Sequence, residues 1–251
     1  MILYEYPFNE RLRTYLRLEH LFRRLGELIG RTHPSDHHFA LVTIFEIMDV
    51  AARVDLKSDV LKDLEKQKSL LDSYRSNPSI STELLDQIVG RLDQCFAALN
   101  AQTGKTGQNL TENDWLMAIR SRISIPGGTC GFDLPAYHAW QHKDSRDRQL
   151  ALEGWTASLS PLADALFVLM QMLRDTGVPQ RVAAEHGQFQ QNLPTGRTFQ
   201  LLRLRIDPAL DLVPEISGNR LLLSVRLMRA DANGKLQPCQ DDAAFEITLC
   251  A

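Results

Sequence analysis

The sequence predicts an α+β protein in which a helical region lies between two stretches of β-structure. Apolar residues recur with a helical period from Asn9 to about Thr176. Beyond that point, and in the first seven residues, they alternate with the period of two that is typical of a strand. Strands and helices do not alternate along the chain, so a parallel βαβ sheet is not expected. We expect an α-helical domain over residues 9–178 and a mostly antiparallel β domain made of residues 1–8 and 179–251.

Capping and stop signals divide the helical region into segments. Asn9 is a good N-cap for the first segment, which is expected to end near Gly30. Ser35 or Asp36 is expected to cap the second, and Ser81 to cap the fourth. The expected helices cover residues 9–30, 34–53, 55–77, 81–100, 111–124 and 158–177, and another begins near Pro135. The segment 158–177 is apolar on most sides, so we expect it at the centre of the helical core.

Three C-terminal segments, 198–208, 218–229 and 244–251, alternate as strands do. In the second of them we expect an inward face of Leu221, Leu223, Val225 and Leu227, and an opposite face of Arg220, Ser224 and Arg226. The Asn233-Gly234 pair that follows is a hairpin signal.

The first seven residues also alternate, with Ile2, Tyr4 and Tyr6 on one face. A strand needs partners to be stable, and no other strand is expected in the first 175 residues or so. We therefore expect residues 1–7 to pair with the C-terminal sheet.

The composition is that of an ordinary globular chain, and it excludes several classes of function. The 251 residues are 44% hydrophobic and 24% charged, and a net charge of −3 gives no global basic field for nucleic acid. The first ten residues contain Glu5 and no apolar signal-peptide core. The longest apolar run, Ala165–Met170, is far too short to span a bilayer. We expect a cytoplasmic protein that binds no nucleic acid and does not insert into a membrane.

The four cysteines, Cys95, Cys130, Cys239 and Cys250, do not have the spacing of a zinc site. In a reducing compartment, unpaired cysteines behave as small hydrophobic residues. We expect all four to be buried thiols, and we expect neither a metal site nor a cofactor.

The segment TGKTGQN (Thr103–Asn109) ends like a phosphate-binding P-loop. That motif needs a glycine where Leu99 stands, and it needs a strand rather than a helix before it. We expect a flexible interhelical loop that binds no nucleotide, because Gly, Lys, Thr and Asn are common loop residues.

The segment ISIPGGTCGFDLPAYHAWQH (Ile123–His142) admits two interpretations. Cys130 and His138 could form a nucleophile and a base, which would make the protein a hydrolase or transferase for a small molecule. No third group with a defined spacing is visible to orient that pair. Alternatively, Pro126 ends one helix and the glycines allow tight turns before the next, so that the segment is a close-packed joint. We favour the joint.

The first predicted helix has a basic face and an apolar face. At 100° per residue, Arg13, Arg17, His20 and Arg24 fall in one stripe, and Tyr15, Leu18, Phe22, Leu25 and Ile29 lie on nearly the opposite side. The stripe contains no acidic residue at the i+4 spacing that would neutralise it. Together with Arg120 and Arg122, which precede the glycine segment, it indicates a surface for an anionic partner.

Several segments together resemble the ZapD family, the Z-ring-associated D proteins of bacterial cell division. They are YEYPFNERLRTYLRLEHLF, RSRISIPGGTCGFDLPAYHAWQH, WTASLSPLADAL and LLRLRID…VPEISGNRLLLSVRLM, and they occur in the family's order along nearly the whole chain. The resemblance implies a non-enzymatic cytosolic protein with a helical and a β domain. It also implies a symmetric dimer that binds the C-terminal tail of the tubulin-like GTPase FtsZ, bundles FtsZ filaments and supports the division ring at mid-cell.

Seven basic residues are expected to bind the tail. Five match basic positions of the family's pattern and are expected to converge on one surface, namely Arg13, Arg17, His138, Arg220 and Arg226. Arg120 and Arg122 are added because they stand just before the glycine segment. Trp115 and Leu222 stand where relatives can carry arginine, which implies a weaker or reshaped site.

Two other functions are alternatives to tail binding. They are covalent catalysis by Cys130 and His138, and binding of anionic lipid or nucleic acid by the helix stripe. Tail binding through arginines should weaken as ionic strength rises, whereas alkylation of the thiol should abolish covalent catalysis. Co-sedimentation with FtsZ filaments separates all three.

Overall fold

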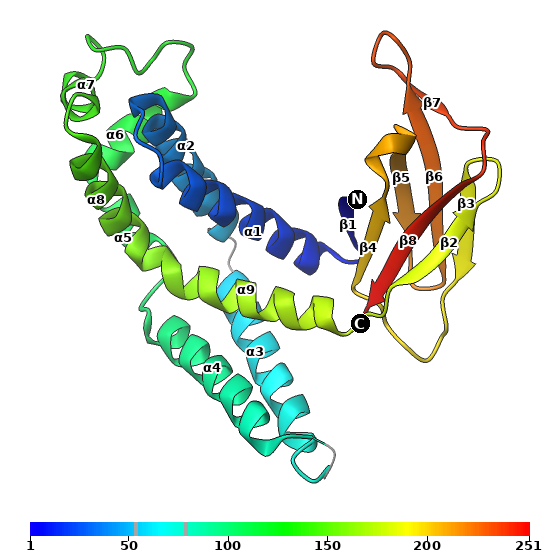
Figure 1. Cartoon of the computed structure of the whole chain (residues 1–251). Helices are drawn as coiled ribbons and strands as arrows, with labels where there is room; N and C mark the ends of the chain where they lie inside the picture. Colours follow the sequence, from blue (N-terminus) through cyan, green and yellow to red (C-terminus); the bar gives the residue numbers. More distant parts are fainter. Residues whose placement is uncertain (53–54, 78–79) are drawn as a thin grey trace. The chain divides into compact units, whose positions relative to one another are not determined.

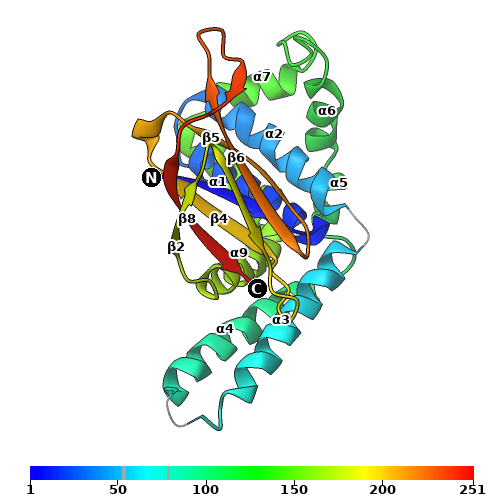
Figure 2. The ribbon, with the colours of Figure 1, turned by 90° about the vertical axis from the view of Figure 1, so that its right-hand side faces the viewer.

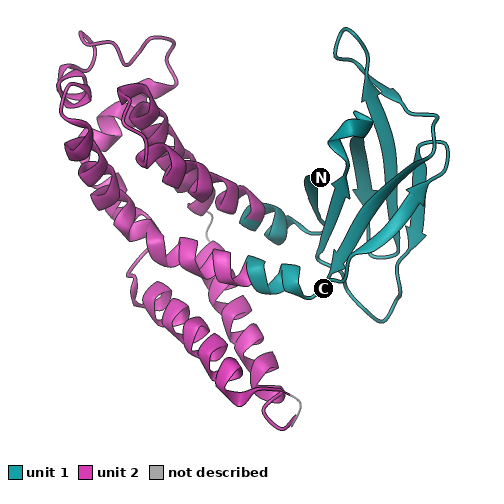
Figure 3. Cartoon of the chain, in the orientation of Figure 1, with its two compact units in different colours: residues 1–15, 170–251 teal, residues 16–169 magenta. Residues whose placement is uncertain are grey.

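The fold is given by a computed structural model that describes residues 1–52, 55–77 and 80–251. The chain divides into two compact units, residues 16–169 and residues 1–15 with 170–251 (Figure 3). Residues 16–169 are called the helical unit below. Residues 1–15 with 170–251 are called the β unit, because they contain the β-strands of the described residues. The chain is therefore an α+β protein, as its sequence predicts.

The helices follow one another along the chain as Figure 1 shows. Their bounds are α1 Glu10–Ile29, α2 Pro34–Ala51, α3 Leu56–Ser73, α4 Thr82–Ala101, α5 Gln108–Thr111, α6 Asp114–Ile123, α7 Pro135–Gln141, α8 Ser145–Thr156 and α9 Ser160–Asp175. A 3₁₀ turn, Ala157–Leu159, joins α8 to α9. α3 and α4 lie side by side as a helical hairpin (Figures 1 and 2). Each predicted helix is present, whereas α5 and α8 were not predicted.

The helix caps follow the sequence signals at two of three positions. Asn9 Oδ1 accepts a hydrogen bond from Leu12 N at 2.8 Å, and Ser81 caps α4 through its hydroxyl. The predicted cap of α2 is wrong, because the cap is His33, whose Nδ1 accepts from Ser35 N at 3.1 Å. Pro34 occupies the first helical position, where its fixed φ fits, and so α2 begins earlier. Residue 53, the end of that predicted segment, lies outside the described residues.

The core of the helical unit is built largely from α2 and the first part of α9. The fully buried apolar residues there are Ala40, Leu41, Ile44 and Ile47 on α2 and Leu162, Ala165 and Leu166 on α9. The central place predicted for 158–177 is thereby confirmed. By length and composition the run Ser145–Asp175 could cross a membrane, and 44% of its most apolar window is buried in the structure. Leu162, Ala165 and Leu166 of this run belong to the core described above.

The β unit contains two antiparallel sheets. The strands are β1 Ile2–Pro7, β2 Gln180–Ala184, β3 Gln188–Asn192, β4 Leu201–Ile206, β5 Val213–Gly218, β6 Leu222–Ala230, β7 Leu236–Pro238 and β8 Ala243–Cys250. One sheet has the order β1-β4-β8-β2, and the other has the order β3-β6-β5, with β7 also paired to β6. Ile2 pairs with Ile206 and Pro7 with Leu201, so the predicted pairing of the N-terminal strand is confirmed.

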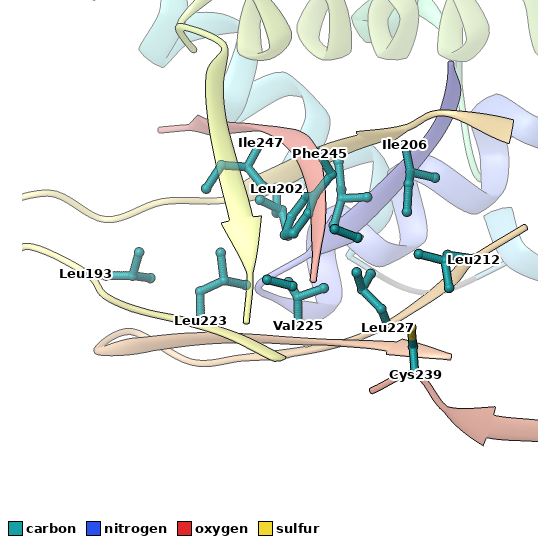
Figure 4. Packing of buried hydrophobic residues seen from close by; sticks show 13 residues of the cluster. Leu193, Leu202, Ile206, Leu212, Leu223, Val225, Leu227, Cys239, Phe245 and Ile247 are labelled. Atoms are coloured by element: carbon teal, nitrogen blue, oxygen red, sulfur yellow. The ribbon is translucent and has the colours of Figure 1, made fainter. Parts of the chain in front are cut away.

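The two sheets enclose one hydrophobic core. Side chains of β6 face those of β4 and β8 across the space between the sheets (Figure 4). The buried members include Leu223, Val225 and Leu227 on β6 and Leu202, Phe245 and Ile247 on β4 and β8. Leu221 is 61% exposed, which corrects its predicted inward position, because β6 begins only at Leu222. The hairpin at Asn233-Gly234 is confirmed by the pairing of β6 with β7 and by a φ of +78° at Gly234.

Candidate functional site

The basic stripe on α1 is only partly open to solvent. Tyr15, Leu18 and Leu25 are buried, as predicted for the opposite face. Arg24, however, donates from Nε to Thr43 Oγ1 at 3.0 Å and forms an ion pair with Glu46, both on α2. The stripe itself has no acidic residue at the i+4 spacing, but a neighbouring helix supplies Arg24 with an acidic partner that the sequence did not reveal.

The two arginines of α1 that are expected to bind the tail differ in their surroundings. Arg13 Nε lies 3.1 Å from Glu10 Oε1, and about 40% of the Arg13 side chain is exposed. Arg17 is exposed and has neither an ion pair nor a hydrogen bond from its side chain within the described part of the chain. Arg17 is thus the more available cation for an external carboxylate.

Arg120 and Arg122 lie in the last turn of α6, where cations complement the helix dipole. Arg120 forms an ion pair with Asp49 of α2. Arg122 Nη1 is 3.9 Å from Asp133 Oδ1, at the limit of an ion pair, and its side chain is 49% exposed. Arg122 therefore has the weaker ion pair of the two and is the more available to a partner.

The glycine segment after α6 is a close-packed joint. Gly127 has a φ of +71°, which favours glycine. A Cβ on Gly128 would lie 2.5 Å from the carbonyl oxygen of Arg122, and one on Gly131 would lie 3.1 Å from the His138 ring. These approaches explain why the segment needs glycine, and they support the interpretation that it fixes the start of α7.

The geometry gives no support to a Cys130–His138 catalytic pair. Cys130 is exposed, which corrects its predicted burial, whereas Cys95, Cys239 and Cys250 are buried as expected. Within the described residues, no hydrogen bond joins Cys130 to His138. The His138 ring instead lies against His142, with 4.5 Å between the ring centroids. The same residues contain no group of three His, Cys, Asp or Glu side chains that could hold a metal ion.

An aromatic cluster formed by residues of α6, α7 and α8 was missed in the sequence. The cluster comprises Trp115, Tyr137, Trp140 and Trp155, and Trp115 stacks on Trp155 with 4.9 Å between the ring centroids. Trp115 is therefore committed to packing rather than to the surface role of an arginine. The presence of all three tryptophans of the chain near α7 was the only signal of this cluster in the sequence.

The Tyr137 hydroxyl joins α7 to α2. It lies 2.6 Å from His38 Nδ1 and accepts a hydrogen bond from Gln141 Nε2 at 3.0 Å. Burial raises the pKa of Tyr137 and lowers the pKa of His38. At neutral pH the tyrosine is therefore protonated and the histidine neutral, so the hydroxyl donates to Nδ1. This bond holds the helix that carries His138.

The surface of the glycine segment also exposes apolar side chains. Phe132 is 85% exposed and Ile125 is 46% exposed. Both lie in the segment that Arg122 and Asp133 border. Exposed aromatic and aliphatic groups beside cations suit a peptide that contains both apolar and acidic residues. Sequence reasoning did not identify them, because a lone Phe in a loop carries no periodic signal.

Arg220 and Arg226 do not share a strand face. Arg226 is on β6, opposite Glu215 of β5, and its Nη1 lies 3.6 Å from Glu215 Oε2. Arg220 lies in the turn before β6, which corrects its predicted place on the strand, because the strand begins at Leu222. Arg220 is exposed, and its side chain has no ion pair or hydrogen bond within the residues that the structure describes.

The expected tail-binding residues are divided between the two units. Arg17, Arg120, Arg122 and His138 belong to the helical unit, and Arg13, Arg220 and Arg226 belong to the β unit. Their convergence on a single surface stays a prediction. Within the helical unit, Arg122 lies just before the glycine joint and His138 lies on the helix that follows it.

Comparison with known proteins gives matches that span the chain. A family model described as "ZapD: Cell division protein" matches residues 16–226. The protein named "Cell division protein ZapD" from Janthinobacterium sp. (strain Marseille) is 48% identical over 251 residues, which is 100% of both chains. Proteins of the same name from Ralstonia nicotianae (strain ATCC BAA-1114 / GMI1000) and Cupriavidus pinatubonensis (strain JMP 134 / LMG 1197) are 48% and 47% identical, over 100% of this chain and 99% of theirs.

Proposed function

Because the chain belongs to the ZapD family of cell division proteins, we propose that it binds the C-terminal tail of FtsZ and crosslinks FtsZ filaments in the division ring. The observation that carries the proposal is the end-to-end similarity to proteins of that name at 47–48% identity. On this proposal the protein is a cytoplasmic, non-enzymatic component of the mid-cell ring.

The exposed arginines supply the chemistry that tail binding requires. An acidic tail with apolar residues is well matched by guanidinium groups, which bind carboxylates in a bidentate manner and lie flat on apolar surface. Arg17 and Arg220 have no acidic partner among the described residues, so an incoming carboxylate displaces nothing there. We rank these two above Arg13, Arg120 and Arg226, each of which already pairs with a carboxylate.

Crosslinking requires at least two tail-binding surfaces. A symmetric homodimer supplies them, because each protomer presents the same surface once. Two weak sites held in one particle also bind a filament lattice far more tightly than one site does. We therefore propose that the functional particle is a homodimer, and that its bundling activity depends on both copies of the surface.

Tail binding is tested by calorimetry with a synthetic FtsZ tail peptide. The Arg17→Glu, Arg220→Glu double variant replaces attraction with repulsion and is expected to weaken binding by at least about tenfold, or roughly 1.4 kcal/mol. The matched control is Lys66→Glu, Lys235→Glu, which makes the same charge change at one exposed lysine in each unit. If the two double variants bound the tail peptide with equal affinity, the proposed binding surface would be ruled out. Binding by the wild-type protein should also weaken as salt is added.

A further inference from the structure

Two connections between strands meet at one end of the β unit. The β5–β6 turn contains Arg220 and Leu221, and the β3–β4 loop, residues 193–200, contains Arg197. Leu193 N, at the start of that loop, donates to the carbonyl of Leu221 at 2.8 Å. Figure 1 shows the two connections at the same end of the β unit. The backbone bond therefore brings the chain around Arg197 and the chain around Arg220 together.

The β5–β6 turn holds an apolar side chain in solvent. Asn219 Oδ1 accepts hydrogen bonds from Leu221 N at 2.8 Å and from Leu222 N at 3.0 Å. Asn219 N in turn donates to the carbonyl of Leu222 at 2.9 Å. These bonds fix the backbone on both sides of Leu221, which is 61% exposed. A partner that covers this leucine gains from its burial without first having to order the turn.

Arg197 is oriented by an aromatic ring and keeps its charge unpaired. Its guanidinium carbon lies 5.3 Å from the centroid of the Phe199 ring, and Phe199 packs against the core of the β unit. The Arg197 side chain has no ion pair or hydrogen bond with any residue that the structure describes, and the same is true of Arg220. Contact with a ring leaves the N–H groups of the guanidinium able to donate to a carboxylate.

The charge of the two connections is positive only. Residues 193–200 and 216–225 include Arg197 and Arg220 but no Asp or Glu. Two copies of this surface would repel each other, which disfavours self-association as its use. A segment that carries carboxylates beside an apolar side chain is complementary to it, because the guanidinium groups can bind the carboxylates while Leu221 covers the apolar group.

We propose that Arg197 and Leu221 form, with Arg220, a docking surface for an acidic peptide segment that carries an apolar side chain. The inference rests on the proposed function, on which that segment belongs to the C-terminal tail of FtsZ. It adds Arg197 and Leu221 to the residues that the sequence indicates for tail binding. The two arginines hold carboxylates of the segment, and Leu221 sets a preference for an apolar residue beside them.

The test is calorimetry of the full chain with the FtsZ tail peptide. Arg197→Gln and Leu221→Ser are each expected to weaken binding by about fivefold or more. The control, Arg229→Gln, makes the same change near the other end of β6, where the arginine is 47% exposed and pairs with Asp241, and it should leave the affinity unchanged. All three side chains are exposed, so the variants should keep the thermal midpoint of the wild type.

A second peptide, in which every Asp and Glu of the tail is replaced by Asn or Gln, separates direct contact from an indirect effect. With this peptide the difference between the wild type and Arg197→Gln should disappear, whereas the loss caused by Leu221→Ser should remain. Added salt should likewise reduce the effect of Arg197→Gln on binding of the acidic peptide, but not that of Leu221→Ser.

The possible failures can be told apart. If the wild type binds the tail peptide and either Arg197→Gln or Leu221→Ser binds it as tightly as the control, the docking surface is overturned while tail binding stands. If the wild type does not bind the peptide, the proposed function fails and this inference fails with it. A changed oligomeric state of Leu221→Ser in size-exclusion chromatography, with unchanged affinity for the peptide, would show instead that the surface joins copies of the chain.

Discussion

At the scale of single residues, Arg148 on α8 is a buried cation held by neutral groups. Its Nε donates to His37 Nδ1 at 2.9 Å and its Nη2 to the carbonyl of Thr32 at 2.5 Å. Nη1 donates to the carbonyls of Gln141 and Lys143. His37 Nε2 lies 2.8 Å from the carbonyl of Arg31, so the ring carries its proton on Nε2 and accepts at Nδ1. The Arg148 side chain thus joins α8 to the start of α2 and to the end of α7.

We predict that Arg148→Met lowers the free energy of unfolding by about 2–4 kcal/mol, because it leaves buried acceptors without donors. The matched control is Arg146→Met on the same helix, where the arginine is 66% exposed and pairs with Glu153 at 3.7 Å. That change should lower the free energy of unfolding by no more than about 0.5 kcal/mol. Urea unfolding measures both, and equal stability of the two variants would contradict the role given to Arg148.

The four cysteines should differ in reactivity. Cys130 is exposed, whereas Cys250 is buried and burial raises the pKa of its thiol. We predict that iodoacetamide modifies Cys130 first, and that Cys130→Ser changes stability by no more than about 0.5 kcal/mol. Filament bundling should be unaffected by either treatment. If alkylation of Cys130 abolished bundling while tail binding persisted, a chemical role for the thiol would have to be reconsidered.

At the scale of elements, a partly buried carboxylate ties β1 to its neighbours in the β unit. Arg174 of α9 donates to Glu5 from Nε at 2.8 Å and from Nη2 at 2.7 Å. Arg203, which pairs with Glu5 across β1 and β4, donates from Nε at 3.1 Å. Burial alone would raise the pKa of Glu5, but the hydrogen bonds and charges of the two arginines outweigh it and hold this pKa below its ordinary value.

The sign of the pH dependence follows from that direction. A carboxylate whose pKa is lower in the folded state stabilises the fold above its unfolded pKa, and this stabilisation is lost as pH falls through the folded pKa. We predict that Glu5→Gln is less stable than the wild type at neutral pH, and that the gap narrows below about pH 4.5. Thermal unfolding across pH, with exposed Glu185→Gln as control, measures the gap. A gap that widened in acid would contradict this account.

The N-terminal strand protects the edge of its sheet. β1 is the outer strand next to β4, whose Leu201, Leu202 and Leu204 are fully buried. Deletion of residues 1–7 exposes the hydrogen-bonding edge of an apolar strand, which favours pairing between molecules. We predict soluble aggregates or precipitation in size-exclusion chromatography. A truncated chain that eluted as sharply as the intact protein would show that this edge is protected in another way.

At the scale of the whole molecule, the fold class, the helix periods and the N-terminal strand follow from sequence patterns. Three strands were missed for a physical reason: β3 and β5 are the edges of their path and β2 is the outer strand of its sheet. Edge strands are covered on one side only, so β3 reads QFQQN, with Phe189 as its one apolar residue, and Pro214 and Gly218 weaken the strand signal of β5. α8 was missed because a buried arginine occupies its inward face.

The candidate site was less predictable than the fold. A sequence shows which residues are basic, but ion pairs depend on neighbours that folding supplies. Arg120 meets Asp49, which is 71 residues away, and Arg24 meets Glu46 on another helix. The exposure of Phe132 and the packing of Trp115 likewise follow from tertiary contacts. The structure therefore distinguishes basic residues that already form ion pairs from those that are available to a partner, whereas the sequence shows only which residues are basic.

On the function proposed above, the protein crosslinks filaments through the FtsZ tail. The most direct measurement is low-speed co-sedimentation of the protein with filaments of intact FtsZ and with filaments of FtsZ that lacks its C-terminal tail. Intact filaments are expected to pellet as bundles together with the protein, whereas tailless filaments are expected to stay in the supernatant, as is the protein. Equal pelleting of tailless filaments would contradict it.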